Sequence, residues 1–510
     1  MLSIINSCCV YGMFGHLIKV EVDVSDGLPG FDIVGLPDTS VKESKERVRT
    51  AIKNSYFKFP MKRITVNLAP ADLKKEGPLF DLPIAIGILA ATRQIADNDK
   101  IKLSAMVGEL SLDGKVRPIP GVLAMSDRIS QIEEVQYFLV PEENACEAAL
   151  IPGTTVYPIS SLRDLTDFLK GEYDILPQEV DVNALLKEPY QENSCDMSEV
   201  RGQQGVKRAL EVAAAGGHNI LLSGSPGSGK TMLARRLPSI LPSLTLEESL
   251  ELTRIYSIAG LLPKNQALIT QRPFRAPHHS ASAASLIGGG RTPRPGEISL
   301  ACHGILFLDE MAEYQKSILE ALRQPLEDKT VTITRVEASY SFPAKFQLVG
   351  SLNPCPCGFY GDPLKECTCT PHQIHKYLGK ISGPLLDRID IRMDVPRVDY
   401  KDLSSDIPAE SSAQIRQRVE KARQIQGERF IGTGIVCNAH MGRKQVQEYC
   451  QPTKEAKKLL QEAYHQLRLS ARSHDRILKV SRTIADLESS EEIQLNHIAE
   501  AIQYRGTQFS

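Results

Sequence analysis

One short stretch constrains the fold of this chain more than any other: NILLSGSPGSGKTMLARRL, residues 219–237. Its apolar start predicts a strand, its end predicts a helix, and glycines punctuate the loop between them. Glycines allow successive backbone N–H groups to curl around phosphate groups at a helix N-terminus. The stretch therefore predicts a phosphate-binding loop (P-loop) in an α/β core. The residues expected to bind the nucleotide are Gly224, Ser225, Pro226, Gly227, Ser228, Gly229, Lys230 and Thr231.

Two members of this loop have individual roles, and they need an acidic partner. Lys230 is expected to reach the β and γ phosphates of ATP, and the Thr231 hydroxyl to ligate Mg²⁺. The stretch GILFLDE, residues 304–310, supplies the acids after an apolar strand. We expect Asp309 to hold Mg²⁺ through water and Glu310 to polarise the attacking water. An Asp-Glu pair after a strand is common by itself. At a distance of about 80 residues after a P-loop, it is a specific signal of the acidic partner of that loop.

A third apolar strand, in AKFQLVGSLNP (residues 344–354), ends in Asn353. An amide at that position can orient the attacking water against the γ-phosphate, which is the sensor role in AAA+ ATPases. The alternative is an asparagine that only turns the chain into Pro354.

Arginines downstream are candidates for completing the site. Arg388 follows an apolar turn, where an arginine finger can reach the nucleotide of a neighbouring subunit in a closed ring. The alternative is a surface ion pair with Asp387. On a C-terminal helix, Arg472 is our choice for a second sensor, with Arg482 as the alternative.

Cysteines are concentrated directly after Asn353, in NPCPCGFYGDPLKECTCT, residues 353–370. We expect Cys355, Cys357, Cys367 and Cys369 to bind one Zn²⁺, which takes four thiolates in a tetrahedron. The alternatives are reduced thiols or a pair of disulfides. The N-terminus lacks the pattern of a signal peptide and no apolar run is long enough to span a membrane, so we expect a cytoplasmic protein, in which disulfides are disfavoured.

The formal net charge of −2 excludes a chain that is basic throughout, so any contact with nucleic acid has to come from local patches. Residues 271–296 are rich in glycine and contain no acid, which suits a loop that follows a phosphate backbone, or arginines that bridge to neighbouring subunits. A predicted hairpin at 328–344 could present Lys329, Arg335 and Tyr340 to DNA, or be buried. The arginines of the first patch are Arg272, Arg275, Arg291 and Arg294.

The order of these motifs resembles the magnesium-chelatase-like branch of the AAA+ ATPases. Over nearly all 510 residues the chain resembles the ComM/YifB family, notably in residues 26–52, 67–85 and 274–290. The resemblance implies a homo-hexameric ATPase that moves on single-stranded, forked or branched DNA. It implies that the motor drives branch migration during natural transformation, including on recombinase-bound DNA. A chelatase motor subunit and an AAA+ protein-remodelling factor are the alternatives.

Two stretches of the N-terminal part, KKEGPLFDLPIAIG (residues 74–87) and VGELSLDGKVRPIPGVLAM (residues 107–125), resemble the patterns around the catalytic serine and lysine of Lon proteases. The resemblance implies the fold of their proteolytic domain, a ribosomal S5 domain 2-like α/β fold. Leu79 stands where that family has its catalytic serine, and Leu123 where it has its catalytic lysine. A leucine can serve neither as nucleophile nor as base. The resemblance therefore implies a domain that keeps the fold and has lost the chemistry.

The pattern along the chain predicts four parts. We expect a Lon-like domain at 1–170, a polar linker at 171–198, an AAA+ core with the hairpin and the cysteines at 199–400, and a helical lid at 401–510.

Overall fold

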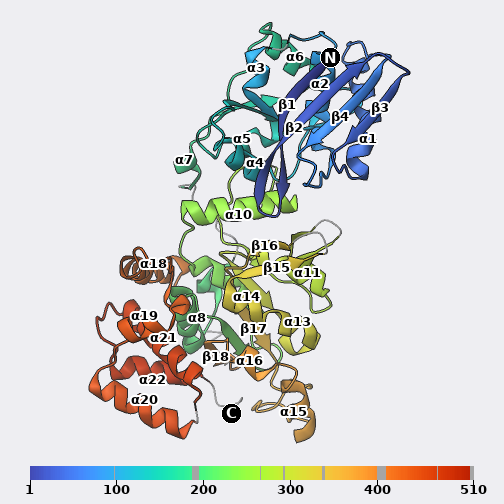
Figure 1. Ribbon diagram of the computed structural model, residues 1–510. Helices are drawn as coiled ribbons and strands as arrows, with labels where there is room; N and C mark the ends of the chain where they lie inside the picture. Colours follow the sequence, from blue (N-terminus) through green and yellow to red (C-terminus); the bar gives the residue numbers. More distant parts are fainter. Residues whose placement is uncertain are drawn as a thin grey trace. The chain divides into compact units, whose positions relative to one another are not determined.

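The structure is a computed structural model of the 510-residue chain. It describes all residues except 97, 187–194, 265, 291–292, 336–338, 399–408, 468 and 506–510. The chain forms two compact units, which are described separately (Figure 1). The first unit comprises Met1–Glu188 and Leu246–Thr270, and the second comprises Pro189–Thr245 and Gln271–Ser510.

The first unit is built on a seven-stranded sheet with the order β3-β4-β2-β1-β5-β8-β9. Strands β1 and β2 form a long antiparallel hairpin whose alternate residues are buried, as half-buried strands require. The strands are β1 (Leu2–Tyr11), β2 (Phe14–Ser25), β3 (Gly30–Val34), β4 (Arg63–Ala69), β5 (Ser104–Met106), β8 (Tyr137–Pro141) and β9 (Thr155–Ile159); β6 (Glu109–Leu110) and β7 (Val116–Arg117) form a separate small ladder.

Helix α2 (Asp81–Ala91) is the centre of this unit, because every one of its residues is buried and it packs on β1 and β2. Its first residue, Asp81, is held by an ion pair with Arg47 at 2.7 Å. The other helices of the unit's first segment are α1 (Thr39–Asn54), α3 (Asp99–Lys102), α4 (Val122–Ile129), α5 (Ala145–Ala148), α6 (Leu162–Lys170) and α7 (Val182–Leu186).

Helix α10 (Leu246–Ala259) belongs to this first unit, although it follows the P-loop in the chain. It packs on α4, and the Gly121 N–H before α4 donates to the Ser257 carbonyl at 3.1 Å. The expected boundaries differ here, because they assign 246–270 to the ATPase core. A helical pattern in the sequence does not say which unit the helix packs on.

The second unit contains a five-stranded sheet with the order β11-β14-β17-β10-β18, in which each pairing is parallel. The three central strands are buried along their whole length, as expected for a sheet covered on both faces. The strands are β10 (Ile220–Ser223), β11 (Phe274–Arg275), β14 (Ile305–Leu308), β17 (Gln347–Leu352) and β18 (Ile391–Asp394).

Helices surround this sheet. Helix α8 (Gln204–Gly216) precedes β10, and α9 (Lys230–Arg236) follows it. The others in the core are α11 (Ala283–Ile287), α12 (Glu297–Leu300), α13 (Lys316–Ala321), α14 (Arg323–Asp328), α15 (Pro371–Leu378) and α16 (Gly383–Leu386). Two hairpins complete it: β12 (Gly288–Gly289) with β13 (Arg294–Pro295), and β15 (Thr330–Thr334) with β16 (Ser339–Pro343).

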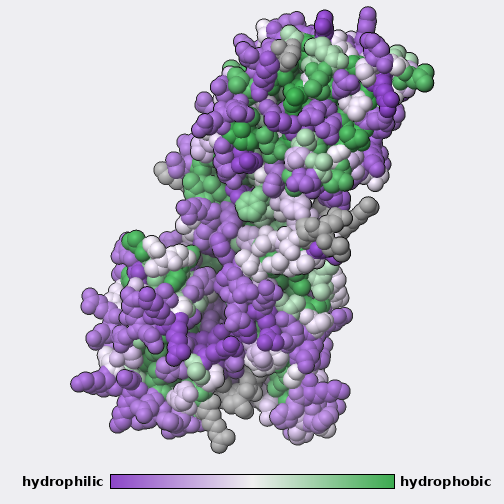
Figure 2. Space-filling model, viewed as in Figure 1, coloured by the Kyte–Doolittle hydropathy of each residue, from purple (hydrophilic) through white to green (hydrophobic). Residues whose placement is uncertain are grey.

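The C-terminal helices pack on the core of the same unit, and one hydrophobic cluster runs through both. Helices α18 and α21 both contact α8, and Figure 1 shows the lid helices gathered together. They are α18 (Ser412–Arg429), α19 (Arg443–Tyr449), α20 (Lys454–Gln466), α21 (Ala471–Leu487) and α22 (Leu495–Gln503). On the face seen in Figure 2 the surface over α20 is mostly hydrophilic. Within the described residues, none of the helices combines the length and the apolar character needed to cross a membrane.

Candidate nucleotide-binding site

The P-loop joins β10 to α9, as the sequence predicts. Gly227 and Gly229 have φ values of +80° and +90°, a left-handed region that favours glycine. A Cβ atom on Gly224 would lie 2.5 Å from the Val395 carbonyl oxygen, so this position has no room for a side chain. The backbone conformation and packing of the loop therefore favour glycine at these three positions.

Lys230, the first residue of α9, is only 8% exposed. Its ammonium donates to the carbonyl oxygens of Gly224 (2.6 Å) and Ser225 (3.1 Å) and to Oδ1 of Asn353 (3.2 Å). Burial lowers the pKa of Lys230, and the charges of Asp309 and Glu310 oppose that shift. The Lys230 ammonium is thus held by two carbonyls of the P-loop and by Asn353.

Asp309 follows β14, and its carboxylate meets the P-loop helix directly. The Thr231 hydroxyl donates to Asp309 Oδ2 at 3.1 Å, so the two predicted Mg²⁺ ligands are neighbours. The Ser351 hydroxyl donates to the other oxygen, Oδ1. Sequence reasoning missed Ser351, although it lies two residues before Asn353 on the strand next to β14.

Glu310 and Asn353 end neighbouring strands, β14 and β17, at the same edge of the sheet as the P-loop. Glu310 is exposed and has a φ of +49°, and its N–H donates to the Ser351 hydroxyl at 2.9 Å. The structure therefore brings together the P-loop lysine, the Asp-Glu pair and the asparagine. Polar groups at the carboxyl edge of a parallel sheet converge in this way wherever the strands are adjacent.

The two predicted arginines lie elsewhere in the unit. Arg388 is 9% exposed, and its guanidinium pairs with Glu327 on α14 and donates to the Pro384 carbonyl at 2.7 Å. Its partner is thus Glu327 rather than Asp387. The hydrogen bond from Arg388 lowers the pKa of Glu327, and the charge of Arg472 contributes to the same shift. Among the described residues, neither arginine forms a hydrogen bond or ion pair with the P-loop.

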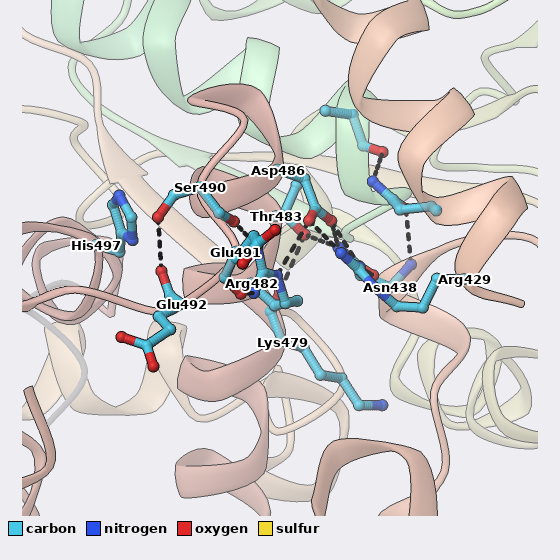
Figure 3. A network of polar contacts seen from close by, with 12 residues as sticks. Arg429, Asn438, Lys479, Arg482, Thr483, Asp486, Ser490, Glu491, Glu492 and His497 are labelled. Atoms are coloured by element: carbon cyan, nitrogen blue, oxygen red, sulfur yellow. Dashed lines mark hydrogen bonds and ion pairs between the residues drawn. The ribbon is translucent and has the colours of Figure 1, made fainter. Parts of the chain in front are cut away.

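Arg482 is part of a buried polar network in the lid (Figure 3). Its Nε donates to Asp486 at 3.0 Å, and its Nη1 donates to the Glu491 carbonyl at 2.6 Å. Arg429 and Asn438 donate to the same carboxylate of Asp486. Arg482 is only 3% exposed, and its bonds connect parts of the lid to one another. Arg472, on the same helix, is exposed.

The four predicted zinc ligands lie in one cluster. Cys355 Sγ is 3.3 Å from Cys357 Sγ and 3.6 Å from Cys367 Sγ, and all four sulfurs, including that of Cys369, lie within 4.8 Å of one another. A tetrahedral Zn²⁺ with Zn–S bonds of about 2.3 Å separates its sulfurs by about 3.8 Å. The cysteines are free, so the disulfide alternative is not what the structure contains.

The two candidate DNA-contacting segments lie against each other. Ile333 of the β15–β16 hairpin packs on Gly288, and the Arg335 guanidinium donates to the Gly290 carbonyl at 3.1 Å. Arg294 pairs with Gly289 across the β12–β13 ladder and is exposed. Exposed arginines from both segments therefore occur at one place on the second unit.

Other residues predicted for DNA contact have structural roles. Arg272 donates to the carbonyls of Pro242 and His303 at 2.6 Å, and Arg275 forms a bidentate pair with Glu297 at 2.7 Å. Lys329 is the C-cap of α14 rather than a strand residue, and burial lowers its pKa. Tyr340 is half-buried on β16, and Arg291 lies outside the described residues.

Leu123, which we predict to stand in place of the Lon lysine, is fully buried in a cluster with Leu150 and Leu268. Its N–H donates to Glu147 at 2.8 Å, and Ser257 of α10 donates to the same carboxylate. Leu79, which we predict to stand in place of the Lon serine, is 8% exposed. Segment 246–270 thus helps to fill the surroundings of Leu123.

The parallel sheet, its converging P-loop edge and the helical lid define the second unit as an ATPase core of the AAA+ class. The chain matches the family described as magnesium chelatase, subunit ChlI, over residues 196–403. It also matches subunit ChlI of Mg-chelatase over 20–144 and the ChlI C-terminal family over 409–505.

Comparison with full-length relatives identifies the family within this class of ATPases. The chain is 44% identical over 513 residues to the competence protein ComM of Haemophilus influenzae, covering 99% of this chain and 97% of that one. It is 43% identical over 507 residues to YifB of Escherichia coli, with the same coverage. A segment is 27% identical over 183 residues to Lon protease 2 of Bacillus subtilis, covering 32% of each chain. The chain belongs to the ComM/YifB family of magnesium-chelatase-like AAA+ ATPases, and the predicted fold class is confirmed.

Proposed function

We propose that this ATPase is a homo-hexameric ring that translocates on DNA and promotes branch migration during homologous recombination of incoming DNA in natural transformation. The observation that carries the proposal is that exposed arginines from two separate segments lie beside neighbouring glycines: Arg335 donates to the Gly290 carbonyl, and Arg294 is paired with Gly289. Similarity to a competence protein over 99% of the chain supports a role in competence. Exposed arginines can neutralise backbone phosphates of any sequence, as a translocating motor needs.

In this proposal ATP and Mg²⁺ bind at the converging edge of the sheet. Lys230 contacts the β and γ phosphates, and Thr231 and Asp309 hold Mg²⁺. Glu310 polarises the attacking water and Asn353 orients it. The hydrogen bond that Asn353 accepts from Lys230 supports this assignment, because it places the amide beside the phosphate-binding cation.

Arg388 acts across the subunit interface on the neighbour's nucleotide, and Arg472 responds to the nucleotide as second sensor. Both lie in the electrostatic field of Glu327, so the finger has to leave that carboxylate before it can reach a phosphate. The Cys355, Cys357, Cys367 and Cys369 thiolates bind one Zn²⁺, in agreement with the spacing of their sulfurs.

The test is the ATPase rate with and without single-stranded, duplex and forked DNA, together with DNA affinity over a salt series. We expect forked DNA to stimulate the rate, and affinity to fall steeply as salt rises because bound phosphates release counterions. Replacing both Arg294 and Arg335 with Ala should weaken binding to all sequences and flatten the salt slope, with basal ATPase kept. Arg443→Ala, which removes an exposed arginine from α19, is the matched control.

A chelatase motor subunit is the second candidate, because the matched families carry that description over both the core and the lid. It predicts no stimulation by DNA and stimulation instead by a porphyrin-carrying partner. If forked DNA changes neither the ATPase rate nor the oligomeric state at low salt, the DNA motor is refuted in favour of this candidate.

A further inference from the structure

The segment between the two cysteine pairs lies directly on the P-loop. Gly358, which follows Cys357, has a φ of +84°, and a Cβ atom built on it would lie 2.6 Å from two ring carbons of Pro226. The absence of a side chain therefore lets the Gly358 backbone approach the proline ring closely. A backbone N–H···O bond of 3.0 Å from Gly358 to Cys355 ties this contact to the first cysteine pair.

A second contact lies four residues further on, at Asp362. The interaction of its carboxylate with the Ser225 side chain of the P-loop lowers the pKa of Asp362 to about 2 and keeps it charged. The same carboxylate accepts from Arg397, just after β18, at 2.8 Å, and from the Leu364 N–H at 2.9 Å. Its side chain has no solvent exposure. Asp362 thus joins the cysteine segment, the P-loop and the sheet.

The cysteine segment has little else to hold its shape. Residues 354–370 contain neither helix nor strand, and Tyr360 and Leu364 are 49% and 78% exposed. Without a core of its own, a segment of this length depends on a cross-link to limit its conformations. The four sulfurs stand at its two ends, so a metal bound to them supplies that cross-link, and its binding free energy becomes folding free energy of the segment.

We propose that the metal held by the four cysteines acts as a brace for the P-loop, so that occupancy of the cysteine site sets the affinity for nucleotide. This inference rests on the proposed zinc site. Asp362 and Gly358 of the cysteine segment contact Ser225 and Pro226, while Lys230 is held by the carbonyls of Gly224 and Ser225 and by Asn353. Loss of the metal frees the segment, removes both contacts and leaves the phosphate-binding N–H groups less well ordered.

The experiment measures metal content and the affinity for a fluorescent ATP analogue on the same full-length samples. Protein purified in reductant should contain about one zinc per chain. Stripping the zinc under reductant, followed by return to Mg²⁺, should weaken nucleotide binding about tenfold or more, the loss expected for a hydrogen bond to a charged group. Adding Zn²⁺ back should restore it, with circular dichroism confirming that the helices persist.

Two variants separate the brace from the metal site itself. Asp362→Ala should keep the zinc and lose nucleotide affinity to a similar extent, because it cuts the connection and not the metal site. Lys365→Ala, an exposed change in the same segment, should alter neither. Protein without zinc refutes the zinc site. Full zinc content in Asp362→Ala, with nucleotide affinity within twofold of the parent, refutes the brace and leaves the zinc site standing.

Discussion

Asp486→Asn tests whether the buried network of the lid is a structural element. The Asp486 side chain is inaccessible to solvent, and its carboxylate faces two guanidinium groups, those of Arg429 and Arg482. Their side chains are only 14% and 4% exposed. The substitution preserves the shape of the side chain and removes the one negative charge between two cations.

The magnitude follows from this arrangement. Removing one partner of a buried ion pair costs about 3–5 kcal/mol, because the remaining charge is left uncompensated. Arg482 also donates to the Glu491 carbonyl, so it cannot turn outward to water without losing that bond. At about 1.4 kcal/mol per factor of ten, the opening of this region should become roughly 100- to 4,000-fold more frequent.

Amide hydrogen exchange with peptide-level mass spectrometry measures this opening locally. We expect that acceleration in peptides from α21 and α18, which the network connects. Arg472→Gln, an exposed change on α21, should stay within about 0.5 kcal/mol, or roughly twofold. Asp486→Glu, which retains the charge, should recover most of the protection if the Asn variant folds poorly.

An acceleration below fivefold in a folded Asp486→Asn protein would show that the network does not stabilise the lid. If Arg482 were instead the second sensor, its replacement by Gln would abolish the response to nucleotide while leaving hydrogen exchange unchanged.

Three further predictions concern the active and former active sites. Lys230→Ala should abolish ATP binding, measured by nucleotide affinity, whereas Glu310→Gln should bind ATP and retain it, because only the water-polarising group is lost. Arg388→Ala should bind ATP but hydrolyse it slowly, and mixing it with Glu310→Gln subunits should restore part of the turnover; intact mixed rings without any restoration would contradict a finger acting in trans. Purified protein should not cleave casein with or without ATP, because leucine can act neither as nucleophile nor as base at the two positions, 79 and 123, where the Lon resemblance predicts the catalytic residues; cleavage that comigrates with the chain on gel filtration would contradict this.

The residues of the candidate nucleotide site could be predicted from short stretches, and the structure brings them together. The P-loop glycines, Asp309 and Asn353 each come directly after an apolar strand. Such a motif is recognisable from a few consecutive residues, because those residues set both the backbone geometry and the side-chain chemistry. The strand order then brings these ends together, since β14, β17 and β10 are neighbours in a parallel sheet. The cysteine cluster was also predicted, because a metal site needs a recognisable set of ligands at short spacing.

Contacts between residues far apart in the chain were not readable in this way. Lys329 looked like a basic residue of a hairpin, but the structure makes it a half-buried helix cap, and the partner of Arg388 is Glu327, 61 residues earlier. Arg472 and Arg482 were both candidates for the second sensor on one predicted helix. In the structure Arg482 is buried in an ion-pair network, whereas Arg472 is exposed.

The sequence by itself determined the family, the fold class and the residues that converge at the P-loop edge of the sheet, because each of these depends on motifs of a few consecutive residues. Only the tertiary structure decided that residues 246–270 pack with the first unit and that the cysteine segment lies on Ser225 and Pro226. Those arrangements depend on which surfaces bury each other. A helical pattern or a run of cysteines does not identify the surface on which the segment packs. Many different partners can cover the same apolar face or bond to the same carboxylate.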